Sequence, residues 1–284
     1  MFEAYETLEA ACAHNIRNAL MEDIGRGDWT GLLIPAGRHV HARVTVREVA
    51  VLAGRAWFEG CLHALDPQAA ITWHFAEGAD TPAHQAVCEI DAEARALLSA
   101  ERPALNLLQL LSATATRAHV RAIEGASPNP RGCVVLDTRE TLPGLRQAQQ
   151  YAVRVGGGQN QRLALWHGLL IKETHIAAAG GVSAAVANGF ALQSDVEIQI
   201  EVETLDQLRE ALAAGATSVL LDNFTEAAMR ASVAINAGRA LLEVSGGVML
   251  KQLRGIAATG VDRISIGKLT KDVQAVDYSM HVTG

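Results

Sequence analysis

The stretch VEIQIEVETLDQLREALAAGATSVLLDN, residues 196–223, reads as a strand, a helix and a second strand. Residues 196–203 and 218–223 are short and largely apolar, whereas residues 205–215 carry apolar side chains at helical spacing. Strand–helix–strand units of this length join parallel strands through a right-handed crossover. The stretch therefore predicts a parallel α/β sheet or barrel.

The same alternation of predicted strands and helices continues on both sides of this stretch. We expect further strands over residues 133–138, 169–173, 240–247 and 263–268. We expect further helices near residues 144–154, after residue 173, over residues 226–238 and over residues 249–260. Polar residues close each predicted strand, and in a (β/α) barrel the active site lies at the carboxyl ends of the strands. The polar strand ends therefore locate the expected site.

The first part of the chain has a different pattern. Residues 6–22 have helical spacing, residues 40–55 alternate with period two, and residues 71–78 and 86–94 alternate again. This predicts a small α+β domain with one solvated sheet face. Residues 95–124 read as helix, and we expect Pro103 to start a new helix there.

The composition indicates a globular enzyme with an aliphatic core. Of 284 residues, 49% are hydrophobic but only 4% are aromatic, and the net charge is −7. The chain has no basic face with interleaved aromatics, which argues against nucleic acid as a partner. It has neither a signal peptide pattern nor an apolar run of about 18 residues. Four widely spaced cysteines indicate reduced thiols, so we expect a cytoplasmic protein without a membrane partner.

Two glycine turns at the last predicted strand ends favour phosphate binding. Glycine lets backbone N–H groups approach a phosphate closely, and barrel phosphate sites often use the late loops. The candidate phosphate-binding residues are Ser245, Gly246, Gly247, Ser265 and Gly267.

Acidic and basic side chains at the other strand ends supply the remaining candidates. Glu201 and Asp222 end neighbouring strands and could hold Mg²⁺ together, although Asp222 could also cap a helix. Arginine forks match carboxylate and phosphate oxygens. The candidate cations are Arg102, Arg139, Arg162 and Lys172, and His175 is either a packed histidine or a ligand contact. Lys172 would alternatively form a Schiff base if this were an aldolase-type barrel.

The order of motifs resembles that of quinolinate phosphoribosyltransferases over nearly the whole chain. The matching text is ALMEDIGRGDWT (19–30), AERPALNLLQLLS (100–112), DTRETLPGLR (137–146), YAVRVGGGQNQRL (151–163), LLIKETHI (169–176), EVETLDQL (201–208), LLDNF (220–224), EVSGG (243–247) and TGVDRISIGKLTKDVQAVDYSM (259–280).

The resemblance implies an N-terminal α+β sandwich domain over residues 1–110, joined by part of 270–284, and an incomplete (β/α) barrel over 111–270. It implies a homodimer in which Arg102 reaches the partner's site. The implied reaction joins a pyridine dicarboxylate to 5-phosphoribosyl-1-pyrophosphate (PRPP) with Mg²⁺, releasing pyrophosphate and CO₂ to give nicotinate mononucleotide. Lys172, Glu201 and Asp222 would be catalytic, and the two carboxylates would face the ribose and the metal. The acceptor and pyrophosphate would contact Arg102, Arg139, Glu140, Gln161, Arg162, Lys172 and His175.

The chain departs from the usual family text at several positions of this region. Glu140 and Gln161 stand where Lys and His are usual, and the other departures are Ala113, Gln150, His167 and Thr174. A carboxylate about 4 Å from an anionic acceptor costs roughly 4 kcal/mol at an effective dielectric near 20. We therefore expect Glu140 to disfavour quinolinate if it faces the acceptor. The alternatives are a paralogue for a less anionic or amino-bearing heterocycle and a catalytically silent sugar-phosphate-binding dimer.

Overall fold

The computed structural model describes residues 5–125 and 132–283. They form two compact units, the first made of Met1–His119, Thr141–Gly157 and Thr270–Gly284 and the second of Val120–Glu140 and Gly158–Leu269. The predicted domains, 1–110 with 270–284 and 111–270, thus place residues 111–119 and 141–157 differently from this division. Residues 1–4, 126–131 and 284 of those predicted ranges lie outside the described residues.

The first unit is built on an antiparallel sheet with the strand order β12-β1-β5-β3. These strands are β1 (His39–Val46), β3 (Ala70–Trp73), β5 (Gln85–Glu93) and β12 (Tyr278–Val282), and a separate pair comprises β2 (Ala50–Val51) and β4 (Asp80–Thr81). The last strand brings the end of the chain back into this unit. The unit also contains α1 (Leu8–Ile24), η1 (Gly31–Leu33), α2 (Arg55–His63) and α4 (Arg146–Val155).

Helix α3 (Ala94–Gly125) runs without a break through the position predicted to start a new helix. Pro103 lies inside it, so the predicted restart is wrong. Proline removes one backbone hydrogen bond from a helix, a cost that tertiary packing can offset. Here the neighbours Leu97, Ala100, Leu105 and Leu108 are all buried in the apolar core.

The second unit is a parallel sheet of six strands with the order β6-β11-β10-β9-β8-β7. The strands are β6 (Val134–Leu136), β7 (Gly168–Ile171), β8 (Glu197–Val202), β9 (Ser218–Asp222), β10 (Leu241–Ser245) and β11 (Arg263–Ser265). The helices are α5 (Glu173–Ala179), α6 (Val182–Ala191), α7 (Leu205–Ala213), α8 (Glu226–Asn236) and α9 (Leu253–Ala257), with short turns η2 (Leu250–Gln252) and η3 (Gly267–Leu269).

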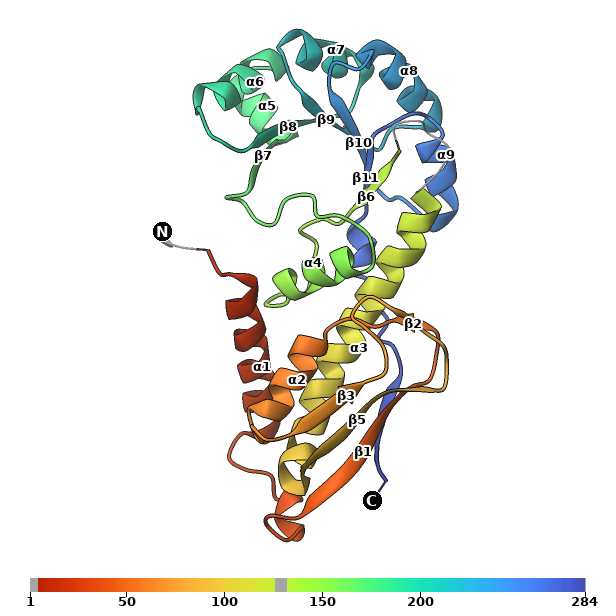
Figure 1. Ribbon diagram of the computed structural model, residues 1–284. Helices are drawn as coiled ribbons and strands as arrows, with labels where there is room; N and C mark the ends of the chain where they lie inside the picture. The colour runs from red at the N-terminus through yellow and green to blue at the C-terminus, as the bar shows by residue number, and fades with distance from the viewer. Residues whose placement is uncertain (1–4, 126–131, 284) are drawn as a thin grey trace. The chain divides into compact units, whose positions relative to one another are not determined.

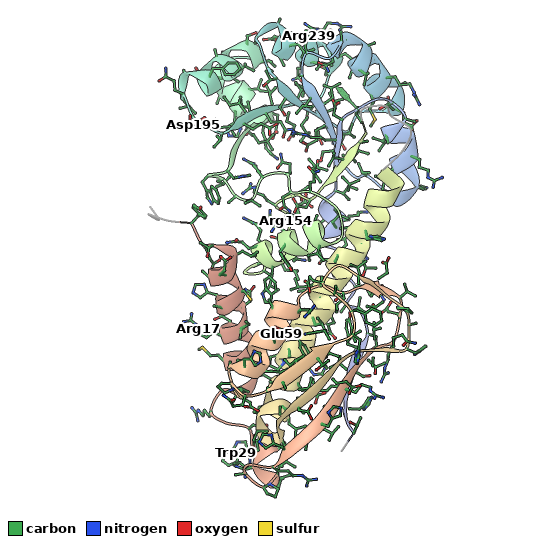
Figure 2. All side chains as sticks on the ribbon, viewed as in Figure 1. Arg17, Trp29, Glu59, Arg154, Asp195 and Arg239 are labelled. Atoms are coloured by element: carbon green, nitrogen blue, oxygen red, sulfur yellow. The ribbon has the colours of Figure 1, made fainter. Side chains whose placement is uncertain are left out.

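Helices α5–α9 lie on the outer side of the curved sheet, and the strands surround an interior filled with side chains (Figures 1 and 2). Strands β6 and β7 are the two ends of the strand order, so the barrel is incomplete, as predicted. Beside β6, a single parallel bridge joins Leu136 to Gln159. Among residues 5–125 and 132–283, no helix combines the length and apolar character needed to cross a bilayer.

Candidate active site

Strand alternation directs a series of polar side chains into the barrel. Residues at i, i+2 and i+4 of a strand share one face, so Glu197, Gln199 and Glu201 of β8 lie on the same side. The neighbouring strands continue this face with Ser218 and Asp222 of β9, Glu243 and Ser245 of β10, and Arg263 and Ser265 of β11. Their carboxyl-terminal members therefore meet at one end of the barrel.

Lys172 and Glu201 form an ion pair at this end. Lys172 directly follows β7, and its Nζ lies 3.8 Å from Glu201 Oε2. The Glu201 side chain is only 13% exposed, whereas that of Lys172 is 46% exposed. Burial raises the pKa of Glu201, Lys172 opposes this shift, and the Asp222 carboxylate adds to it. The structure therefore brings together the three residues predicted to be catalytic.

The turn after β10 is shaped by a close approach between Gly246 and Asn223. Gly246 has a φ of +95°, and a β-carbon placed on it would lie 2.7 Å from Asn223 Cγ and 2.9 Å from Asn223 N. Asn223 N donates to Ser245 O at 3.2 Å, and Asn223 Nδ2 donates to Asp222 Oδ2 at 2.7 Å. Asn223 thus links the predicted phosphate turn to Asp222, one of the predicted metal ligands.

The turn after β11 contains the second predicted glycine. A β-carbon placed on Gly267 would lie 2.8 Å from the Glu140 carboxyl carbon, so this carboxylate packs on the glycine. The expectation that Glu140 contacts the acceptor stays a prediction, and in this structure its carboxylate lies against Gly267. Because β6 pairs with β11, the segments that follow the two strands run side by side and carry Glu140 to the phosphate turn.

The remaining candidates occupy distinct environments. Burial and the nearby Arg139 lower the pKa of Arg162, whose Nη1 donates to Gly168 O at 3.1 Å. His175 Nδ1 accepts from Lys172 N at 3.0 Å, so its ring caps the first turn of α5. Ser265 is buried, and its hydroxyl donates to Val244 O at 3.5 Å. Arg102 is exposed on α3 in the first unit and lies 4.0 Å from Glu101.

Two glutamines and a buried glutamate are joined by hydrogen bonds beneath the site, and this arrangement was not predicted. Gln161 Nε2 donates to Gln199 Oε1 at 2.8 Å, and Gln199 Nε2 donates to Glu243 Oε2 at 2.8 Å. Glu243 is 1% exposed and burial raises its pKa, which the bond from Gln199 partly opposes. Its Oε1 has no hydrogen-bond partner within the described part of the chain. The signal was the polar residue Gln199 between Ile198 and Ile200 of a buried strand.

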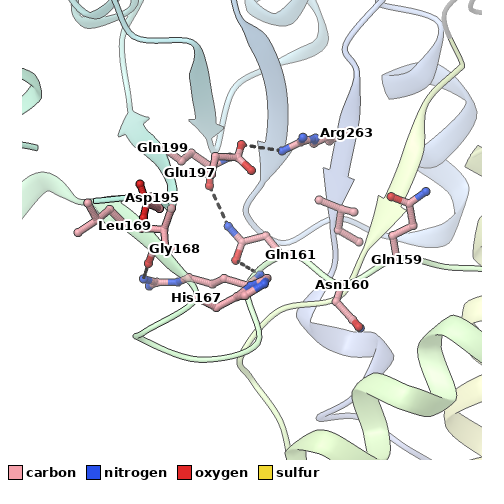
Figure 3. Close-up of a pocket in the computed structure, with 13 residues that line it drawn as sticks. Gln159, Asn160, Gln161, His167, Gly168, Leu169, Asp195, Glu197, Gln199 and Arg263 are labelled. Atoms are coloured by element: carbon pink, nitrogen blue, oxygen red, sulfur yellow. Dashed lines mark hydrogen bonds and ion pairs between the residues drawn. The ribbon is translucent and has the colours of Figure 1, made fainter. Parts of the chain in front are cut away.

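A cavity of about 360 Å³ lies beside these three side chains, and Figure 3 shows the residues that line it. It is lined by Gln161, Arg162 and His167 and by the first residues of three strands: Gly168, Glu197 and Arg263. Arg263 Nη1 and Glu197 Oε1 form an ion pair of 3.0 Å across it. The cavity therefore borders the amino-terminal half of the barrel, whereas Lys172, Glu201 and Asp222 lie at the carboxyl ends.

The departures from the family text are spread over the molecule. Gln161 and His167 line the cavity, and Thr174 is exposed in the first turn of α5. Ala113 and Gln150 are buried in the first unit. The expectation that these departures gather in one acceptor region stays a prediction.

Comparisons with known proteins match this architecture to one family along the chain. The family model described as Quinolinate phosphoribosyl transferase, N-terminal domain, matches residues 28–112, and the corresponding C-terminal domain model matches residues 112–281. A probable nicotinate-nucleotide pyrophosphorylase [carboxylating] of Bacillus subtilis (strain 168) is 37% identical over 271 residues, covering 94% of this chain and 92% of that protein.

Two further matches cover similar lengths. The nicotinate-nucleotide pyrophosphorylase [carboxylating] of Mycobacterium leprae (strain TN) is 38% identical over 282 residues, covering 95% of this chain and 96% of that protein. The solved structure of the nicotinate-nucleotide pyrophosphorylase from Francisella tularensis superposes with a TM-score of 0.91 at 38% identity, covering 98% of this chain and 97% of that one.

Proposed function

This chain belongs to the quinolinate phosphoribosyltransferase family, and we propose that it transfers the 5-phosphoribosyl group of PRPP to the ring nitrogen of quinolinate. The products are pyrophosphate, CO₂ and nicotinate mononucleotide. The names of the matched relatives agree with this pentosyltransferase activity and give no support to a different acceptor or to a silent binding protein.

The single observation that supports this proposal most is the Lys172–Glu201 pair beside Asp222 at the carboxyl ends of the barrel strands. In the reaction, the nitrogen lone pair forms a bond to ribose C1 while the bond from C1 to the pyrophosphate oxygen breaks. Positive charge develops at C1, and a partly buried carboxylate stabilises such charge more than one in water does. We assign this role to Glu201, and to Lys172 the role of a cation for the departing pyrophosphate.

The Lys172–Glu201 pair also argues against the aldolase-type alternative. A Schiff base forms from a neutral amine in a pocket that favours loss of the ammonium charge. Lys172 instead lies beside a carboxylate and is 46% exposed, an environment that suits a cation.

The donor set at the strand ends fits Mg²⁺. This ion is usually bound through one or two carboxylates together with water and substrate phosphates. Glu201 and Asp222 supply two carboxylates, and the described residues contain no group of three or more His, Cys, Asp or Glu that could hold an ion alone. Such a set suits an ion that arrives with the pyrophosphate and would neutralise its charge.

We further propose that the chain acts as a cytoplasmic homodimer in which Arg102 completes the site of the other copy. Its side chain is 58% exposed on α3, so it is available to a second molecule. Light scattering would give the mass in solution. Mixing Arg102→Ala chains with Glu201→Gln chains should restore part of the activity if one site takes these residues from different copies, and no recovery would contradict the proposal.

The decisive assay is pyrophosphate release from PRPP and Mg²⁺ with quinolinate, run beside a panel of pyridine and aminopyridine acids. We expect turnover with quinolinate by the unmodified chain and its loss in Glu201→Gln. The double variant Glu140→Lys, Gln161→His tests the two changed positions. Activity only in the double variant, or only with another heterocycle, would contradict quinolinate as the acceptor.

A further inference from the structure

Glu140 occupies an unusual place beside the turn that follows β11. A β-carbon placed on Gly267 would lie 2.8 Å from the Glu140 carboxyl carbon and 3.3 Å from its Oε1, whereas real β-carbons essentially never approach other atoms within 3.0 Å. The carboxylate therefore fills the space that exists only because residue 267 lacks a side chain. The companion glycine Gly247 has open space, with no such atom within 4 Å among the described residues.

This space is suited to an anion. A glycine turn allows oxygens to approach the backbone closely, which is why such turns bind phosphate groups. A carboxylate shares with phosphate its negative charge and its acceptor oxygens. Glu140 is also exposed to solvent.

The backbone holds Glu140 next to this turn. Glu140 N donates to Thr138 Oγ1 at 3.1 Å, and the preceding Asp137 is buried and accepts from Gln161 N at 3.0 Å. On the other side of the strand pair, Ile266 N donates to Leu136 O at 2.9 Å. The register of β6 and β11 thus fixes the start of both segments and places the carboxylate on Gly267.

We propose that the Glu140 carboxylate is a built-in competitor for the 5-phosphate of PRPP at Gly267. This inference rests on the proposed function, because it takes the turn to be the phosphate site of that reaction. Two anions cannot share the space over one glycine without strong repulsion. The substrate's phosphate must therefore displace Glu140, and the side chain lowers the affinity for phosphoribosyl compounds at a step before any chemistry.

The test is direct binding of ribose 5-phosphate, which carries the 5-phosphate without pyrophosphate, measured by titration calorimetry. Glu140→Gln keeps the size of the side chain and removes its charge. We expect this variant to bind ribose 5-phosphate about ten- to a hundredfold more tightly than the unmodified chain. This gain in affinity is smaller than the one that two unscreened charges about 4 Å apart would give. The apparent affinity for PRPP should increase in parallel.

Two controls separate this local effect from a general change of charge. Glu203 is an exposed acid that follows β8 in the same unit, and Glu203→Gln should change the affinity for ribose 5-phosphate by less than about twofold. Binding of inorganic pyrophosphate with Mg²⁺ should be the same in Glu140→Gln and the unmodified chain. Equal gains from Glu140→Gln and Glu203→Gln would overturn the proposal.

The outcomes also separate this proposal from the proposed function. Unchanged or weaker ribose 5-phosphate binding in Glu140→Gln would overturn the competition, and so would the absence of ribose 5-phosphate binding in every variant. If no acceptor releases pyrophosphate but Glu140→Gln still binds ribose 5-phosphate more tightly, the proposed reaction fails while the competition at Gly267 stands.

Discussion

Replacing Gly246 with alanine should destabilise the barrel through a contact that can be worked out from the structure. Gly246 has a φ of +95°, and its new methyl carbon would lie 2.7 Å from Asn223 Cγ and 2.9 Å from Asn223 N. An L-residue in a left-handed conformation costs about 1–2 kcal/mol. Overpacking adds about 1–3 kcal/mol, because Asn223 N is backbone and is bonded to Ser245 O. We expect a total loss of about 2–5 kcal/mol.

The neighbouring glycine supplies a matched control. Gly247 has a φ of +57°, with no atom near its added β-carbon within 4 Å among the described residues, so Gly247→Ala should cost only about 1–2 kcal/mol. Urea unfolding followed by circular dichroism would measure both, and thermal melting should shift by about 2–4 °C per kcal/mol. Gly246→Ala should also raise the KM for PRPP, because displacing Asn223 moves Asp222. Equal stability of the two variants would refute the contact argument.

Three further substitutions test the Lys172–Glu201 pair and the hydrogen-bonded residues Gln161, Gln199 and Glu243. Lys172→Met removes the cation that opposes the raised pKa of Glu201, so this pKa should rise further. Because activity needs the carboxylate, the acid limb of the kcat/KM profile should move to higher pH. An unmoved acid limb would contradict this. Glu243→Gln should flatten the pH dependence of stability. Burial raises the pKa of Glu243 in the folded state, so the stability of the unmodified chain falls as pH rises from the ordinary carboxyl pKa through the folded-state pKa. The loss is up to about 1.4 kcal/mol for each unit by which the two pKa values differ. Urea unfolding at pH 5 and pH 8 measures this slope, and an identical slope in both proteins would count against a raised pKa of Glu243. Gln161→Leu leaves Gln199 Oε1 without its donor and should cost about 1–3 kcal/mol in the same unfolding assay, whereas a neutral result would show that the bond contributes little.

Much of the site was predictable because it follows from strand periodicity. The strand that carries Glu201 near its end and the one that ends at Asp222 are recognisable as largely apolar runs with acids at their carboxyl ends. Parallel pairing brings such ends to one edge. The glycines of the turns after β10 and β11 are likewise recognisable from the sequence, because each follows an apolar run. Gln199 carries the same kind of signal, because a polar residue between Ile198 and Ile200 of a buried strand needs a partner inside the barrel.

Other features depended on which distant segments become neighbours. Residues 141–157 follow a barrel strand, and their helix α4 has an ordinary helical pattern, yet it packs with the first unit. Pro103 is a common helix start, yet the buried leucines around it keep α3 continuous. For α4, tertiary packing decided only which unit the predicted helix joins, whereas for Pro103 the apolar packing of α3 overrode a local preference.

The sequence by itself determined the alternation of strands and helices, the inward face of each strand and the positions of the glycines, because these depend on backbone preferences within a few residues. Only the tertiary structure decided that Glu140 packs on Gly267 and that Gln161 bonds to Gln199. Those contacts join residues far apart in the chain, and the Glu140 contact depends on the strand order that places β6 beside β11. Glu140, a charge change that the sequence predicted to face the acceptor, lies in the folded protein against Gly267 of the turn after β11.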